Sequence, residues 1–135
     1  MTADFGVVVL TMGKRPEDLR RGLDSLLAQQ DVVIDVVVVG NNWEPIDLPD
    51  GIRALGLPEN VGIPAGRNAG VPLVEGELLF FLDDDASLPD PHFLASIKGR
   101  FDSDPQLGLI QPRVEDPTGA EPPGRWVPRL RVGDR

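Results

Sequence analysis

The chain has 135 residues, a formal net charge of −9 and no cysteine. Its length is that of one ordinary domain, and the missing cysteines exclude disulfides and thiolate metal sites. The negative charge argues against a general affinity for nucleic acid or anionic membranes, because both favour basic patches. No apolar run approaches the roughly 20 residues that cross a bilayer, and the amino terminus lacks a signal-peptide pattern. The cytoplasm is therefore the expected compartment, with peripheral membrane attachment through a partner as the alternative.

The first part of the chain predicts a strand, a helix and a second strand. Residues 5–11 and 32–39 are short valine-rich runs, which are typical of strands buried on both faces. Between them, Pro16 suits the first turn of a helix, and leucines recur at helical spacing as far as Leu27. This order predicts a strand-helix-strand unit of a parallel sheet.

The alternation continues after a loop. Residues 41–50 are polar and contain prolines, which predicts the loop, and residues 52–57 predict a short strand. A helix is expected within residues 58–76, with Pro64 in its first turn and Gly76 just past its end.

Two strands and one helix are predicted beyond this point. Residues 77–82 predict a buried strand, residues 90–101 a capped amphipathic helix, and residues 107–111 a final strand. The whole order predicts an α/β fold, a Rossmann-like three-layer sandwich with a mainly parallel sheet. In this interpretation residues 1–111 form the domain, and residues 112–135, which are rich in proline, glycine and arginine, form an extended tail.

Three consecutive carboxylates follow the apolar run of residues 77–82. Asp83, Asp84 and Asp85 repel one another, so we expect a compensating positive charge beside them. Divalent cations prefer oxygen ligands of this kind, and open α/β sheets bind their ligands at the carboxyl ends of parallel strands. The alternative is a solvated acidic turn that caps the next helix.

Other residues with polar or glycine character belong to the same predicted edge. Gly66 and Gly70 are spaced four residues apart, which predicts close packing of a helix on the sheet. Gly62 lies at the start of this helix, where exposed amides and Arg67 suit an anion, although a surface salt bridge is the alternative for Arg67. Packing at the sheet edge is preferred for Trp43 over stacking on a base or sugar.

Together these motifs resemble the nucleotide-sugar-binding half of the family 2 glycosyltransferases, which have a GT-A fold. The resemblance covers residues 5–111. It rests on residues 7–11 with Arg15-Pro16-Glu17, residues 36–39 before Asn41, residues 58–62, residues 65–70, and residues 76–85 followed by Pro89-Asp90.

The resemblance implies a donor site for a sugar on a nucleoside diphosphate, with Mn²⁺ or Mg²⁺ as the cofactor. It implies that the metal is held by Asp85, with Asp83 as a second ligand and Asp84 assisting. It further implies transfer to an acceptor hydroxyl with inversion at the anomeric carbon, the acceptor being a glycan, a lipid or a small molecule. The residues implied in binding the nucleotide sugar are Thr11, Asn41, Arg67, Asn68, Asp83 and Asp84.

The chain departs from the family pattern in two places. The family usually has an aspartate directly after the second strand, where it contacts the nucleobase, but this chain has Gly40-Asn41-Asn42-Trp43, so no uridine preference is implied. A complete enzyme also continues into an acceptor-binding half that supplies the catalytic base. Gly124-Arg125-Trp126 lacks the glutamine of the Gln-x-x-Arg-Trp motif found there, and no catalytic base is identified.

Two functions therefore stay open. The first is a glycosyltransferase, or a truncated piece of one. The second is a non-catalytic module that completes its sheet through another chain, whether a second copy or a missing carboxyl-terminal half. A response-regulator-like domain fits poorly, because it requires acids after the first strand and a lysine after the last. This chain has Thr11-Met12-Gly13 and Gln111-Pro112 at these places.

Overall fold

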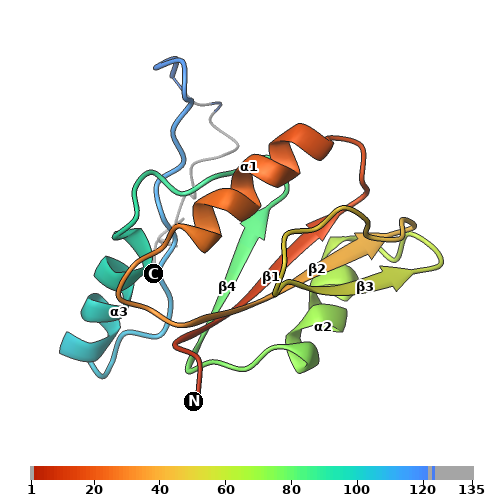
Figure 1. Ribbon diagram of the computed structural model, residues 1–135. Helices are drawn as coiled ribbons and strands as arrows, with labels where there is room; N and C mark the ends of the chain where they lie inside the picture. Colours follow the sequence, from red (N-terminus) through yellow and green to blue (C-terminus); the bar gives the residue numbers. More distant parts are fainter. Residues whose placement is uncertain (1, 122, 124–135) are drawn as a thin grey trace, which may run out of the picture.

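The computed structural model describes residues 2–121 and 123, and its centre is a four-stranded, all-parallel sheet with the strand order β3-β2-β1-β4. Helices cover both faces of the sheet (Figure 1), as expected for a three-layer α/β sandwich. The elements in chain order are β1 (Phe5–Thr11), α1 (Pro16–Leu27), β2 (Ile34–Asn41), β3 (Arg53–Leu57), α2 (Ile63–Gly70), the 3-10 helix η1 (Val71–Leu73), β4 (Leu78–Asp83) and α3 (Phe93–Ser103).

One face of the sheet packs against α1 and α3. α1 begins at Pro16, as predicted, and two acids in its first turn suit the positive end of the helix dipole. Gln29, just after α1, accepts a hydrogen bond from the Leu94 backbone N–H at 3.0 Å and donates one to the Asp90 carbonyl at 2.8 Å, which ties α3 to α1. The buried residues of this core are Phe5, Val7, Val9, Leu19, Leu23, Leu26, Val36, Val38, Leu82 and Leu94.

The opposite face packs against α2 and η1, and glycines set how closely α2 approaches. A Cβ at Gly66 would lie 2.7 Å from a methyl carbon of Leu10, and one at Gly70 would lie 2.7 Å from Val8 and 2.9 Å from Val39. These separations are shorter than van der Waals contact allows, so only glycine permits this approach. The predicted packing role of Gly66 and Gly70 is thus confirmed.

The end of α2 differs from the prediction. α2 ends at Gly70 and is followed by η1, whereas the helix was expected to continue almost to Gly76. Pro72 explains the early end, because proline lacks the N–H that an α-helix needs and its ring clashes with the preceding turn. Gly76 serves a different purpose, since a Cβ there would overlap the backbone of Phe5 and Gly6.

The final predicted strand is also wrong. Residues 107–111 form no strand, and Leu109 is 78% exposed. Gly108 and Pro112 weaken the strand propensity of this segment, and the Leu107 N–H instead closes a turn on the Asp104 carbonyl at 3.1 Å. β4 therefore pairs only with β1 within the described part of the chain.

β2 is displaced along the sequence from its predicted position. It begins at Ile34 rather than Val32 and continues to Asn41, because its pairing with β1 begins at Phe5 opposite Ile34. β2 therefore includes Gly40 and Asn41, and the loop that follows it begins at Asn42, at the carboxyl-terminal end of the strands.

Residues 112–121 of the predicted tail contain a turn but no helix or strand. The Gly119 N–H bonds to the Asp116 carbonyl at 2.9 Å, and hydrogen bonds from Thr118 lower the pKa of the Asp116 carboxyl. Residues 122 and 124–135 lie outside the described residues, and so does the Gly124-Arg125-Trp126 motif.

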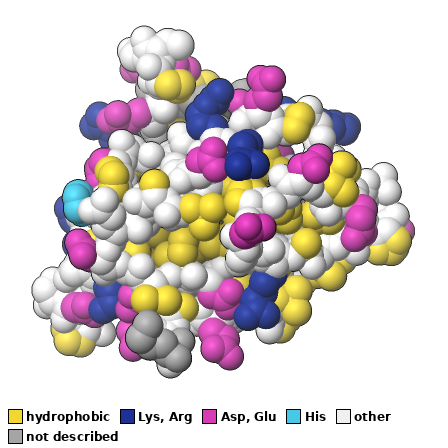
Figure 2. All heavy atoms as spheres, in the orientation of Figure 1, with side chains coloured by type: hydrophobic (Ala, Val, Ile, Leu, Met, Phe, Trp, Pro, Cys, Tyr) yellow, Lys and Arg dark blue, Asp and Glu magenta, His cyan; other side chains and the backbone are white. Residues whose placement is uncertain are grey.

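The surface on the α1 side combines a hydrophobic centre with dispersed charges. Figure 2 shows hydrophobic side chains near the middle of this face, with acidic side chains scattered around them. Throughout residues 2–121, each helix is too short or too polar to cross a membrane.

The substitutions Gly70→Ala and Gly99→Ala form a matched test of the packing on α2. Alanine adds at most about 1 kcal/mol of helix propensity, and at Gly99 its Cβ would meet nothing within 4 Å. At Gly70 overpacking, which typically costs about 1–3 kcal/mol, outweighs that gain. We expect urea denaturation to show a higher free energy of unfolding for Gly99→Ala and a lower one for Gly70→Ala. Equal effects of the two substitutions would contradict the packing described.

Candidate functional site

The three carboxylates lie at the carboxyl edge of the sheet, where the ends of β1 and β4 are neighbours. Asp83 is the last residue of β4 and pairs with Leu10 of β1, so Thr11 extends beside Asp84. Asp84 and Asp85 continue into a turn that is closed by a hydrogen bond from the Ala86 N–H to the Asp83 carbonyl at 3.1 Å. The predicted placement of the acids at the end of a strand is confirmed, but the prediction of a buried strand is wrong: β4 is an edge strand of the sheet, and its Leu79 and Phe81 are 50% and 39% exposed.

Each carboxylate has a partner from a different element. Asp83 accepts a hydrogen bond from Arg67 of α2 at 2.9 Å, and Asp85 accepts one from Arg15, the residue before α1, at 2.8 Å. Asp84 accepts a hydrogen bond from the Thr11 hydroxyl at 2.8 Å. The compensating charge expected beside the acids is therefore supplied by two arginines.

The Thr11 hydroxyl holds both Asp84 and the loop after β1 in place. Its hydroxyl accepts a hydrogen bond from the Gly13 N–H at 3.0 Å, and only 3% of the residue is exposed. Gly13 has φ of 73°, and a Cβ there would overlap the Trp43 ring. Trp43 packs against the core and covers this loop, as preferred from the sequence.

Arg67 reaches the site across the open face of β4. Its guanidinium carbon lies 5.6 Å from the centre of the Phe81 ring, a distance that suits a cation–π contact. The Arg67 side chain is 37% exposed and that of Asp83 is 68% exposed, so both are accessible from solvent. The neighbouring Asn68 is exposed on α2.

Asn41 is buried, and its amide holds the loop that leads into α2. It accepts a hydrogen bond from the Val61 N–H at 2.9 Å and donates one to the Gly62 carbonyl at 3.2 Å. Gly62 has φ of 85°, a conformation that favours glycine. Asn41 therefore positions the start of α2, and its contact with a nucleotide stays a prediction.

Arg15 is the site residue that was not predicted to bind a ligand. Its place in Arg15-Pro16-Glu17 contributed to the family resemblance, but nothing in the sequence pairs it with Asp85, 70 residues away. The available signal was its place in the loop after the first strand. Parallel topology brings that loop to the same edge as the acids.

The carboxylates suit a metal ion that shares its ligands with a phosphate. Carboxylate oxygens match the preference of Mg²⁺, which commonly takes one or two of them together with substrate phosphates. Across residues 2–121 and 123, no three histidine, cysteine or acidic side chains converge into a metal site. A metal ion at this edge would therefore need further ligands from a bound molecule or from water.

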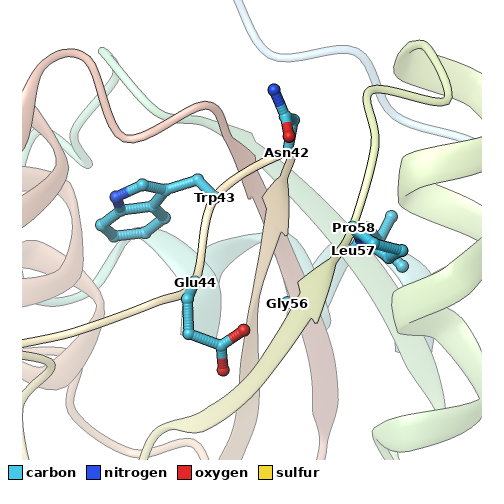
Figure 3. A pocket seen from close by; sticks show the side chains of 6 residues that line it. All are labelled: Asn42, Trp43, Glu44, Gly56, Leu57 and Pro58. Atoms are coloured by element: carbon cyan, nitrogen blue, oxygen red, sulfur yellow. The ribbon is translucent and has the colours of Figure 1, made fainter.

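A hollow of about 310 Å³ lies at the same edge, beside the ends of β2 and β3 (Figure 3). It adjoins the loop after β2 and lies two strands away from β4. The lining residues are Asn42, Trp43, Glu44, Gly56, Leu57 and Pro58.

Comparison with known proteins places this geometry in a family. A family model described as glycosyl transferase family 2 matches residues 7–129, which extends beyond residue 111, where the motifs end. A sequence comparison with curated proteins gives no match.

Two similar solved structures are of the S. aureus protein TarS. TarS 1-349 is 23% identical with a TM-score of 0.60, over 74% of this chain and 32% of that chain. TarS 1-349 in complex with UDP is 23% identical with a TM-score of 0.62, over 80% of this chain and 38% of that chain. The chain thus spans about a third of the length of these structures, which show that the fold is shared. Since the family model matches well over half of its residues, the chain belongs to glycosyl transferase family 2.

Proposed function

We propose that the chain provides the donor site of a glycosyltransferase. It would bind a nucleoside-diphosphate sugar with a divalent metal ion and transfer the sugar, with inversion, to an acceptor hydroxyl. The observation that carries this proposal is the set of three carboxylates at the end of β4, each paired with a residue from a different part of the chain. Family membership supports the reaction class, and the TarS complex with UDP supports the use of this fold for a nucleotide.

Arg15 and Arg67 are the groups that would bind the diphosphate. A guanidinium group carries five donors in a planar fork that matches phosphate oxygens. Both arginines form ion pairs with carboxylates that are about half exposed or more, and exposed ion pairs of this kind are weak. A diphosphate can therefore take over these donors at little cost.

Asp85 and Asp83 would hold Mn²⁺ or Mg²⁺ once their arginines have moved to the diphosphate. When bound, the ion would supply Lewis-acid neutralisation of the leaving diphosphate. Thr11 would keep Asp84 fixed meanwhile, because its hydroxyl is buried and bonded on both sides. Thr11 and Asp84 would thus hold the ends of β1 and β4 in place while Asp83 and Asp85 changed from the arginines to the metal ion.

Turnover distinguishes a transferase from a binding module that has the same donor site. Inversion requires a base that removes the proton from the acceptor hydroxyl, and binding alone does not. Hydrolysis of a radiolabelled sugar nucleotide, or transfer to an acceptor, would support the transferase. Donor binding without either reaction would support the non-catalytic module.

The substitution Asp85→Asn tests the metal ligand. An amide is a much poorer ligand for a divalent cation than a carboxylate, so we expect Mn²⁺-dependent binding of UDP or GDP to weaken by at least about tenfold. Calorimetric titration with and without Mn²⁺ measures this. Asp102→Asn is the control, because Asp102 also pairs with a cation but lies on α3. Unchanged affinity with unchanged metal dependence would show that Asp85 is not the ligand.

The substitution Arg67→Gln tests the phosphate contact. We expect affinity for UDP to fall by about tenfold while affinity for uridine stays the same, because only the diphosphate reaches the guanidinium. Competition binding with the two ligands measures the difference. Arg53→Gln, which removes an ion pair with Asp35 away from the site, should change neither affinity. An equal loss for uridine and UDP would assign Arg67 to another role.

A further inference from the structure

The hollow beside β2 and β3 contains a carboxylate that the proposed donor chemistry does not use. Glu44 lies on its wall, and Figure 3 shows the carboxylate turned toward Gly56. Glu44 is exposed and forms no ion pair with the residues that the structure describes. Within the described part of the chain, no cation competes for its oxygen atoms.

Two paired glycines position this carboxylate. Gly40 of β2 and Gly56 of β3 lie directly opposite each other in the sheet. A Cβ at Gly40 would overlap the Trp43 carbonyl, and a Cβ at Gly56 would overlap the Glu44 carboxylate. The loop after β2 can fold back over the sheet because Gly40 lacks a side chain, and the absence of one at Gly56 leaves room for the Glu44 carboxylate above β3. The hollow is consequently formed by the ends of β2 and β3 and the first residues of the loop between them.

The remaining walls suit a flat, partly apolar ligand. Leu57 and Pro58 contribute apolar surface at the end of β3, and Asn42 lines the end of β2 with its side chain turned away from Glu44. The volume of about 310 Å³ lies at the lower end of the range for small-molecule sites. A carboxylate among such walls selects ligands by their hydrogen-bond donors, because it can only accept.

We infer that this hollow binds guanine, so that the donor is a guanosine-diphosphate sugar; this inference rests on the proposed function. Guanine presents a ring N–H and an amino group side by side, which together match the two oxygens of one carboxylate. Uracil and thymine present one N–H between two carbonyl oxygens, and a carboxylate repels those oxygens. Adenine and cytosine present an amino group beside an acceptor nitrogen, which leaves one carboxylate oxygen unmatched.

The distance across the sheet agrees with a single nucleotide that joins the two places. Neighbouring strands lie about 4.8 Å apart, so the gap between β2 and β3 lies roughly 10–15 Å from the end of β4. An extended nucleoside diphosphate covers a span of this order between its base and its terminal phosphate. A base beside Glu44 therefore places the diphosphate near Arg15, Arg67 and the carboxylates.

Binding of five nucleotides tests the inference. GDP, ADP, CDP, UDP and dTDP are titrated into the 135-residue chain with Mn²⁺, and we expect GDP to bind at least about tenfold more tightly than UDP. Glu44→Gln replaces one acceptor oxygen with a donor and should bring GDP to within about threefold of UDP. Gly56→Ala should have a similar effect, because the added Cβ displaces the carboxylate. Glu75→Gln, which lies before β4 at the amino-terminal end of the strands, should preserve the preference for GDP.

The outcomes separate this inference from the proposed function. Tight binding of UDP or dTDP with no preference for GDP would overturn guanine recognition and leave the donor site intact. A preference for GDP that survives Glu44→Gln would overturn the role of Glu44. Absence of binding by all five nucleotides would overturn both the inference and the proposed function. Circular dichroism and thermal unfolding confirm that each variant is folded.

Discussion

Three adjacent negative charges at the end of the edge strand β4 are the constraint on which the rest of the site depends. β4 is held to β1 along its whole length, so Asp83 and the two acids after it emerge together at one edge and cannot separate. Their repulsion is relieved by Arg67 from α2, Thr11 from β1 and Arg15 from the loop before α1. Each partner comes from a different part of the chain, and the parallel sheet is what brings them together. The same contacts that stabilise the acids hold two arginines where a diphosphate can reach them.

Glycine gives the site its shape by letting other segments approach the sheet. Gly66 and Gly70 allow α2 to lie close enough for Arg67 to cross β4, and Gly40 and Gly56 allow the loop after β2 to cover the sheet edge. The buried Asn41 side chain forms hydrogen bonds with the backbone of Val61 and Gly62 and thereby fixes the start of α2. Substitution at these glycines would therefore alter the geometry of the site before it altered any ligand contact. Packing and the proposed ligand binding would therefore be coupled through the backbone.

Much of this architecture could be predicted from the sequence, because valine-rich runs and the leucine spacing of α1 carry strong periodic signals. The strand before Asp83 and the packing of Gly66 and Gly70 followed from the same kind of pattern. The end of α2 is marked in the sequence by Pro72, which outweighs the helical pattern that continues toward Gly76. The segment after Leu107 could not be predicted correctly, because a strand forms there only if it finds a partner. The pairing of Arg15 with Asp85 and the place of Glu44 over Gly56 arise from tertiary contacts, which no local pattern records.

The central claim is that a divalent ion and a diphosphate meet at the carboxylates after β4. Paramagnetic broadening of backbone NMR signals by Mn²⁺, recorded with and without a nucleoside diphosphate, tests it most directly. The account predicts that Mn²⁺ with the nucleotide broadens the signals of Thr11 and residues 83–85. The signals of Glu75 and Gly76, at the amino-terminal end of the strands, should stay sharp. Broadening centred elsewhere, or unchanged signals at residues 83–85, would contradict it.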